Sequence, residues 1–209
     1  MRVIAIDGPA GSGKSTVARG VAAALQTGEL DTGAMYRTVT LAALRRGVAL
    51  DDGVALAGVA RAMVLQMGER VLLDGEDVTD EIRGLEVSSA VSTVAAHPEV
   101  RAELVRRQRA WAEANDGGVV EGRDIGTVVF PDAHVKVFLT ASEEERARRR
   151  RAEGSDEGTA DLARRDRLDS TRAASPLKPA DDAVVIDSTG RSAEDVIADV
   201  VARVRAARG

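Results

Sequence analysis

Residues 2–16 read RVIAIDGPAGSGKST, and this stretch decides the fold. The run up to Asp7 is mostly apolar and β-branched, which predicts a short buried strand ended by Gly8-Pro9. From Lys14 to about Leu25, apolar residues recur every fourth position, which predicts a helix. Between the two, GPAGSGKS matches every fixed position of the phosphate-binding pattern G-x-x-x-x-G-K-[ST].

This strand–loop–helix setting is the one in which the pattern binds a nucleoside triphosphate. Glycines let backbone N–H groups surround a phosphate, and the helix N-terminus adds partial positive charge. Lys14 is expected to reach the β- and γ-phosphates, and Ser15 is expected to be a ligand of Mg²⁺. The residues expected to contact the nucleotide are Gly8, Pro9, Ala10, Gly11, Ser12, Gly13, Lys14, Ser15 and Thr16.

Further along the chain, helical and strand-like patterns alternate, which predicts a parallel α/β sheet flanked by helices. Hairpin-like pieces with turn residues between them predict a β-rich insertion at 64–75. The expected helices lie at about 34–46 and 51–62, from about Leu85 onward, at 98–114, after Ser142 and after Ser192. The expected later strands lie at 119–120, 135–139 and 183–186.

The composition of the 209 residues fits one compact domain, with 44% hydrophobic and 30% charged residues. Without Cys and with two His, the chain excludes disulfides, thiolate metal sites and multi-His metal sites. A net charge of −5 argues against a generic nucleic-acid coat. No apolar run approaches the ~18 residues that a membrane span needs, and the sequence shows no signal-peptide pattern. We therefore expect a cytoplasmic protein that binds neither membrane nor nucleic acid.

Three classes of nucleotide-binding protein compete. A regulatory GTPase needs an N/T-K-x-D guanine-reading motif, which the sequence lacks, and a motor ATPase usually needs partner subunits or a longer chain. A small-molecule kinase fits the length and predicts a second anion site. Asp31-Thr32-Gly33-Ala34-Met35-Tyr36-Arg37 offers a hydroxyl and an Arg at a helix start, while Glu121-Gly122-Arg123-Asp124 follows a strand.

The chain resembles bacterial cytidylate kinases along its whole length. The resemblance rests on GPAGSGKST (8–16), DTGAMYR (31–37), DGEDVTDEIR (74–83), GRDIGTVVFPDA (122–133) and SPL (175–177). It implies one P-loop kinase domain over 1–209, with a monophosphate-binding insertion at about 62–96 and a short lid at about 150–166. It also implies a monomer that transfers the γ-phosphoryl group of ATP to CMP or dCMP with Mg²⁺.

The resemblance also implies roles for single residues. Thr32, Arg37 and Arg123 would bind the acceptor phosphate, and Arg165 would bridge the two substrates as a catalytic residue with Lys14 and Arg123. The residues implied around cytosine and sugar are Ser92, Arg101, Asp124 and Arg172 for the base and Asp169 for the sugar hydroxyls. The family often has Ser at the position of Thr32 and Asp at that of Glu121, substitutions that keep the chemistry and change the reach.

The arginines at 146–151 support two interpretations. Glu143, Glu144 and Glu145 lie within one or two turns, which favours a solvated face with ion pairs. The resemblance instead implies that Arg149 and Arg150 meet the phosphates of ATP. Two alternatives to a cytidylate kinase stay open at this point: a kinase for another monophosphate such as UMP, and a regulatory nucleotide-binding module without turnover.

Overall fold

The computed structural model describes residues 2–152, 159–172 and 175–207. The helix and strand bounds below refer to this part of the chain. The loop expected at 154–158, within the expected lid, lies outside it. The side chain of Arg165 also lies outside it, so only the helical backbone of that residue is described.

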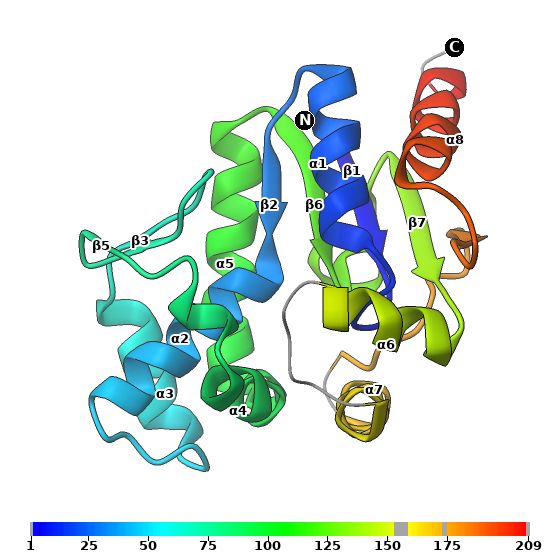
Figure 1. Ribbon diagram of the computed structural model, residues 1–209. Coiled ribbons are helices and arrows are strands. Elements are labelled where there is room, and N and C mark those ends of the chain that lie inside the picture. The colour runs from blue at the N-terminus through cyan, green and yellow to red at the C-terminus, as the bar shows by residue number, and fades with distance from the viewer. Residues whose placement is uncertain (1, 153–158, 173–174, 208–209) are drawn as a thin grey trace.

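A five-stranded sheet, parallel throughout, forms the centre of the molecule in the order β2-β6-β1-β7-β8 (Figure 1). Its strands are β1 (Arg2–Asp7), β2 (Glu29–Asp31), β6 (Gly117–Gly122), β7 (Val135–Thr140) and β8 (Val184–Asp187). The predicted parallel α/β sheet is therefore confirmed. Because all five strands run the same way, their carboxyl ends share one edge of the sheet, where such folds bind ligands.

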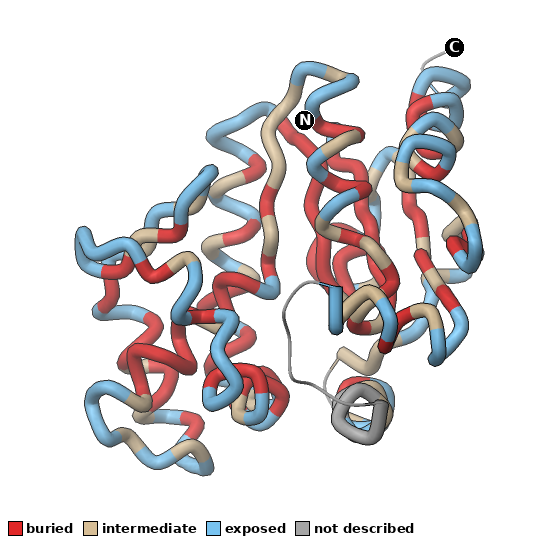
Figure 2. The backbone as a smooth tube through the Cα atoms, in the orientation of Figure 1, coloured by how far each residue is buried: buried red, intermediate tan, exposed pale blue. Residues whose placement is uncertain are grey.

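Helices cover both faces of this sheet, because side chains of β1 alternate between the faces. Val3 and Ala5 pack into one hydrophobic cluster, and Ile4 and Ile6 pack into the other. Figure 2 shows the central strands buried along their length. The helices packed on the first face are α2 (Thr32–Arg45), α3 (Gly53–Ala62), α4 (Leu85–Ala96) and α5 (Pro98–Ala114). Those on the second face are α1 (Lys14–Leu25) and α8 (Ala193–Ala206).

Local sequence signals begin most of these helices. Asp31, Asp52 and Ser192 cap α2, α3 and α8 by accepting backbone N–H bonds, and Pro98 occupies the first turn of α5. The second helix begins at Thr32 rather than at Ala34, because the side chain of Asp31 accepts the N–H of Ala34 at 2.9 Å. The helix thus begins two residues earlier than expected.

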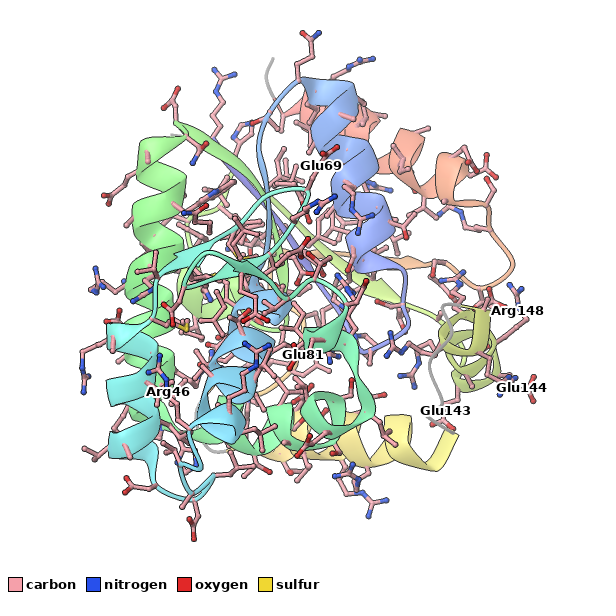
Figure 3. All side chains as sticks on the ribbon, turned by 60° about the vertical axis from the view of Figure 1, so that its left-hand side comes forward. Arg46, Glu69, Glu81, Glu143, Glu144 and Arg148 are labelled. Carbon is pink, nitrogen blue, oxygen red and sulfur yellow. The ribbon has the colours of Figure 1, made fainter. Side chains whose placement is uncertain are left out.

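The expected β-rich insertion is present as a small antiparallel sheet of three two-residue strands. These are β3 (Leu65–Gln66), β4 (Leu72–Leu73) and β5 (Glu76–Asp77), followed by the 3₁₀ turn η1 (Glu81–Arg83). Arg45 at the end of α2 reaches Glu76 at 2.8 Å and Glu81 at 2.5 Å. Figure 3 labels Glu81 and the neighbouring Arg46, which pairs with Asp74 at 3.2 Å. The insertion is therefore attached to α2 through exposed ion pairs.

Two further helices, α6 (Glu143–Ala152) and α7 (Thr159–Thr171), lie near the carboxyl edge of the sheet (Figure 1). The buried Arg146 joins them by an ion pair with Asp166. Arg165 and Asp169 lie four residues apart on α7, and Arg172 follows its end, because α7 ends at Thr171.

Candidate active site

A cavity of about 590 Å³ opens at the carboxyl ends of β1, β2 and β6, which is a usual volume for a ligand site. It is lined by eight basic and five acidic side chains among the described residues. The basic ones are Lys14, Arg19, Arg37, Arg83, Arg101, Arg123, Arg150 and Arg172. The acidic ones are Asp31, Asp80, Glu121, Asp124 and Asp169. The surplus of positive charge suits polyanionic ligands.

The loop between β1 and α1 forms one wall, and its glycines are required by close packing. Gly8 has φ +152°, and a Cβ there would lie 2.1 Å from the carbonyl oxygen of Leu139. Gly11 has φ +74°, and a Cβ there would lie 2.8 Å from the carbonyl oxygen of Arg146. A side chain at either position would clash with backbone, so the loop keeps its tight course only with glycine.

Lys14 begins α1 and is buried, with its Nζ donating to the carbonyl oxygen of Pro9 at 2.9 Å. Burial, and then the positive charge of Arg123, lower the pKa of Lys14 from its ordinary value. Glu121, at the end of β6, shows the opposite shift: burial, and then the charge of Asp31, raise its pKa. These two groups stand together at the P-loop, where the charge of a phosphate would favour the ammonium form of Lys14.

The opposite wall begins at the N-terminus of α2. Thr32 donates its hydroxyl to the carbonyl oxygen of Glu121 at 2.7 Å, which ties α2 to the end of β6. Arg37, one turn later, donates to the Ser88 hydroxyl at 2.7 Å and to the Ile82 carbonyl at 3.2 Å. The guanidinium of Arg37 is thereby braced by α4 and η1 at the cavity wall.

Three ion pairs connect α5, the segment after β6, and α7 with the residue that follows it. Buried Arg101 of α5 pairs with buried Asp124, and Arg172 lies 3.8 Å from the second carboxylate oxygen of Asp124. Arg123 donates to Asp169 of α7 at 3.0 Å. Alternating charges in a buried setting are held in fixed places by one another, so donors and acceptors at this wall are arranged before any ligand arrives.

Tyr36, part of the DTGAMYR stretch, also lines the cavity, although the sequence predicted no role for it. The guanidinium carbon of Arg101 lies over the Tyr36 ring, 5.5 Å from its centroid, in the geometry of a cation–π contact. Burial raises the pKa of Tyr36 to about 12.

Most of the residues expected at the site line this one cavity. From the P-loop these are Ala10, Gly11, Gly13, Lys14, Ser15 and Thr16, and from elsewhere Thr32, Arg37, Ser92, Arg101, Arg123, Asp124, Arg150, Asp169 and Arg172. Gly8, Pro9 and Ser12 complete the loop without lining the cavity. Sequence reasoning assigned no role to Arg19, which lies in no motif, or to Asp80 and Arg83, which lie in the DGEDVTDEIR stretch; all three reach the cavity through packing of α1 and the insertion.

The arginines of α6 divide into two groups. Arg148 and Arg149 pair with Glu145 at 2.7 and 2.8 Å, as expected for a face with ion pairs, and Figure 3 shows Arg148, Glu143 and Glu144 on the outer side of α6. Arg149 also donates to the carbonyl oxygens of Ser12 and Ser188. A solvated position is wrong for Arg146, because its guanidinium is buried against the P-loop carbonyl of Ala10.

Two further features matter in the described residues: side-chain clusters that could bind a metal ion, and helices that could cross a membrane. Among the residues the structure describes, no cluster of three or more His, Cys, Asp or Glu side chains is arranged to hold a metal ion. Within the same residues, no helix combines the length and the apolar character needed to cross a bilayer.

A parallel sheet with a P-loop after its first strand, facing arginines across one cavity, defines a P-loop kinase. The family model described as cytidylate kinase matches residues 4–206. The chain belongs to the cytidylate kinase family. The sequence resemblance is thus confirmed.

Curated relatives agree with this assignment, and a solved structure shares the fold. A cytidylate kinase of Rhodococcus jostii is 53% identical over 208 residues, covering 93% of this chain and 91% of that protein. A cytidylate kinase of Pelotomaculum thermopropionicum is 52% identical, covering 98% and 96%. A crystal structure of an uncharacterized protein from Eubacterium ventriosum aligns with a TM-score of 0.53 at 13% identity, covering 98% and 99%, which shows a shared fold.

Proposed function

We propose that the cavity holds ATP at the P-loop wall and the acceptor nucleotide at the wall formed by α2, α5 and the end of β6. Membership in the cytidylate kinase family gives the reaction: the enzyme transfers the γ-phosphoryl group of ATP to CMP or dCMP, and releases ADP with CDP or dCDP. One observation supports this placement of the two substrates: Lys14, Arg37 and Arg123 line the same cavity but come from different elements.

In this assignment, the residues act by position and charge. A phosphate oxygen of CMP forms a bond to the γ-phosphorus of ATP, and the bond from that phosphorus to the bridging oxygen breaks, leaving the electron pair on ADP. Lys14, Arg123 and Arg165 neutralise charge on the transferring oxygens, and Thr32 and Arg37 hold the acceptor phosphate. The acceptor phosphate is already ionised near neutral pH, so no strong general base is needed.

The base is assigned to Ser92, Arg101, Asp124 and Arg172. Cytosine presents an amino group at N4 and acceptors at N3 and O2, so its reader needs both an acceptor and donors. Asp124 only accepts when ionised, and Arg101 only donates, so the buried pair offers both functions side by side. Asp169, which sits beside Arg123, is assigned to the sugar hydroxyls.

Magnesium is proposed to bind beside the P-loop. Ser15 lines the cavity, and the carboxylate of Glu121 is buried there with one oxygen that lacks a hydrogen-bond partner. A hydroxyl next to such a carboxylate fits a hydrated Mg²⁺, which takes few protein ligands besides substrate phosphates. When bound, the ion would screen the charge of the triphosphate.

The expected subdivision also enters the proposal. We assign the monophosphate-binding insertion to about 62–96 and the lid to about 150–166, within one domain over 1–209. Asp80, Arg83 and Ser92 of the insertion line the cavity, as does Arg150 at the beginning of the lid. The proposal takes the protein as a monomer, and ATP and CMP as substrates support action in the cytoplasm without nucleic-acid or membrane partners.

Turnover with a panel of acceptors tests the function. ADP release is measured with ATP and Mg²⁺ and, in turn, CMP, dCMP, UMP and AMP. We expect CMP or dCMP to give the highest kcat/KM. Higher efficiency with UMP would make the protein a kinase of another monophosphate, and ATP binding without turnover of any acceptor would make it a regulatory module.

A further inference from the structure

Asp7 is a buried carboxylate that none of the roles above uses. It ends β1 and directly precedes Gly8, the first residue of the P-loop, and its side chain points across to the segment after β6. One carboxylate oxygen accepts the N–H of Ile125 at 2.8 Å, and the other accepts the N–H of Gly126 at 2.8 Å. Asp7 is 5% exposed, so both bonds are formed away from water.

These two N–H groups open η2, the short π-helix Ile125–Val129. The first N–H groups of a helix have no partner within the helix and need an acceptor from elsewhere. Here the acceptor comes from a residue about 118 positions earlier in the chain. Asp124 itself makes no capping bond with its side chain, so its carboxylate stays available for Arg101 and the cavity.

These two hydrogen bonds lie just beyond the point where the pairing of β1 with β6 ends. The pairing of β1 with β6 ends at Asp7 and Gly122, so no sheet hydrogen bond holds Arg123 or Asp124. The side-chain partners of Arg123 and Asp124 lie in the substrate cavity. Within the described residues, Asp124 accepts backbone N–H bonds only from the η2 segment that follows it, from Val128 and Val129. Asp7 is the group that ties this segment back to the end of β1.

The carboxylate of Asp7 interacts electrostatically with charged groups on both walls of the cavity. Burial raises the pKa of Asp7 to about 6, and the two backbone hydrogen bonds oppose that rise. The negative charge of Asp124 raises this pKa further, and the positive charge of Lys14 lowers it. The carboxylate is therefore within electrostatic reach of both walls. Burying a carboxylate is costly, which argues for a requirement beyond packing.

We propose that Asp7 is a positioning residue, which fixes the Arg123–Asp124 segment at a set distance from the P-loop through its bonds to Ile125 and Gly126. It touches neither substrate. It holds the residues assigned to the acceptor phosphate and the base in register with the loop assigned to ATP. The proposal rests on the function given above, and wild-type turnover with CMP tests that function first.

Asp7→Asn is the sharpest variant, because it keeps the shape and replaces one acceptor oxygen by an amide donor. One of the two N–H groups then faces another N–H and loses its bond. We expect kcat/KM for CMP to fall roughly tenfold to a hundredfold through a raised KM and a lowered kcat, as a misplaced site does. The Kd for ATP should stay within about threefold, and hydrogen exchange should quicken selectively at the amides of Ile125 and Gly126.

Two further variants separate positioning from stability. Asp7→Thr keeps one acceptor oxygen on a residue suited to strands, and we expect the same pattern as for Asp7→Asn. Val200→Ala removes buried volume on α8, in the cluster on the second face, and should lower stability without changing KM for CMP.

Four results would overturn the proposal: CMP kinetics of Asp7→Asn within twofold of wild type, an equal loss of ATP and CMP affinity, the same CMP defect in Val200→Ala, or failure of both Asp7 variants to fold. The last result would assign Asp7 to the stability of the whole domain. Absence of CMP turnover in the wild type would instead refute the proposed function.

Discussion

Lys14 is one of three lysines in a chain whose other 26 basic residues are arginines, and it stands alone in the P-loop. Its compact ammonium fits a narrow loop where a planar guanidinium would need more room. In the structure it is buried, and its Nζ binds the Pro9 carbonyl oxygen. A phosphate group that enters the loop would offer it a charged acceptor in place of a neutral one, which strengthens the bond.

Lys14→Ala should lower turnover with CMP by roughly 10²-fold or more, because it removes the charge nearest the transferring phosphoryl group. Steady-state ADP release measures the effect, and circular dichroism checks that the fold survives. Exposed Lys178→Ala is the matched control and should keep wild-type rates. Full activity of Lys14→Ala would remove the assigned role.

Arg101→Met tests how the base is read. The variant keeps an unbranched side chain over Tyr36 and removes the guanidinium that pairs with Asp124. A good base contact contributes about 1–3 kcal/mol of discrimination, so the preference for CMP over UMP should shrink by about tenfold or more. The kcat/KM values for both nucleotides on both proteins are compared. An equal fall for CMP and UMP would mean that Arg101 holds structure or phosphate instead.

Sequence motifs predicted the site residues that lie next to a backbone turn. The other site residues reach the cavity through packing, which local sequence does not reveal. Lys14, Thr32 and Arg123 were found because glycines and strand ends mark their places. Arg19 and Arg83 have no such mark, and only the packing of α1 and of the insertion directs them to the cavity. The hydrogen bonds of Asp7 join residues more than a hundred positions apart, which no local pattern reveals.

Among the elements, α7 makes the most direct link between the expected lid and the acceptor wall. Its Asp169 accepts from Arg123, and its Asp166 pairs with Arg146 of α6. Ion pairs of this kind can exchange partners when a charged ligand enters, so we expect the contacts of Asp166 and Asp169 to change on substrate binding.

Asp169→Ala should raise KM for CMP and for dCMP while the Kd for ATP stays nearly unchanged. The change removes the carboxylate assigned to the sugar hydroxyls and leaves Arg123 without that partner. Kinetics with each acceptor and calorimetric titration with ATP measure the two effects. Exposed Ser170→Ala on the same helix is the control. A matching loss of ATP affinity would point to a general defect of the lid.

Long elements were predicted well and short ones poorly. The bounds of α1 and α5 and the start of α4 follow from periodicity and from Pro98. Strand β2 has three residues and η2 has five, so neither offers enough repeats for a pattern. Both are stabilised by partners distant in sequence, β6 for β2 and Asp7 for η2.

For the whole molecule, the raised pKa of Asp7 predicts a pH dependence of stability. The unfolded chain has an Asp pKa near 3.8, and the folded protein has about 6, so between these values the folded state binds more protons. The contribution of Asp7 to the unfolding free energy therefore falls as pH rises from about 4 to 6, by up to about 3 kcal/mol for two pKa units.

Chemical denaturation of wild type and Asp7→Asn at pH 4, 5, 6 and 7 measures this contribution. The difference between the two proteins cancels the titration of other groups, such as Glu145, whose pKa lies below its ordinary value. The unfolding free energy of wild type relative to the variant should decline across this range. A flat difference would show that Asp7 titrates alike in both states.

The alternation of β1 side chains has a consequence for how this sequence tolerates change. Val3 and Ile4 are covalent neighbours, yet they pack into hydrophobic clusters on opposite sides of the sheet. Residues that share no partner contribute independently to stability, so changes at these two positions should add without coupling. Val137, far away in sequence, shares the cluster of Ile4. Among relatives, compensating substitutions should therefore occur between residues of different strands on the same side of the sheet. They should not occur between chain neighbours whose side chains lie on opposite sides.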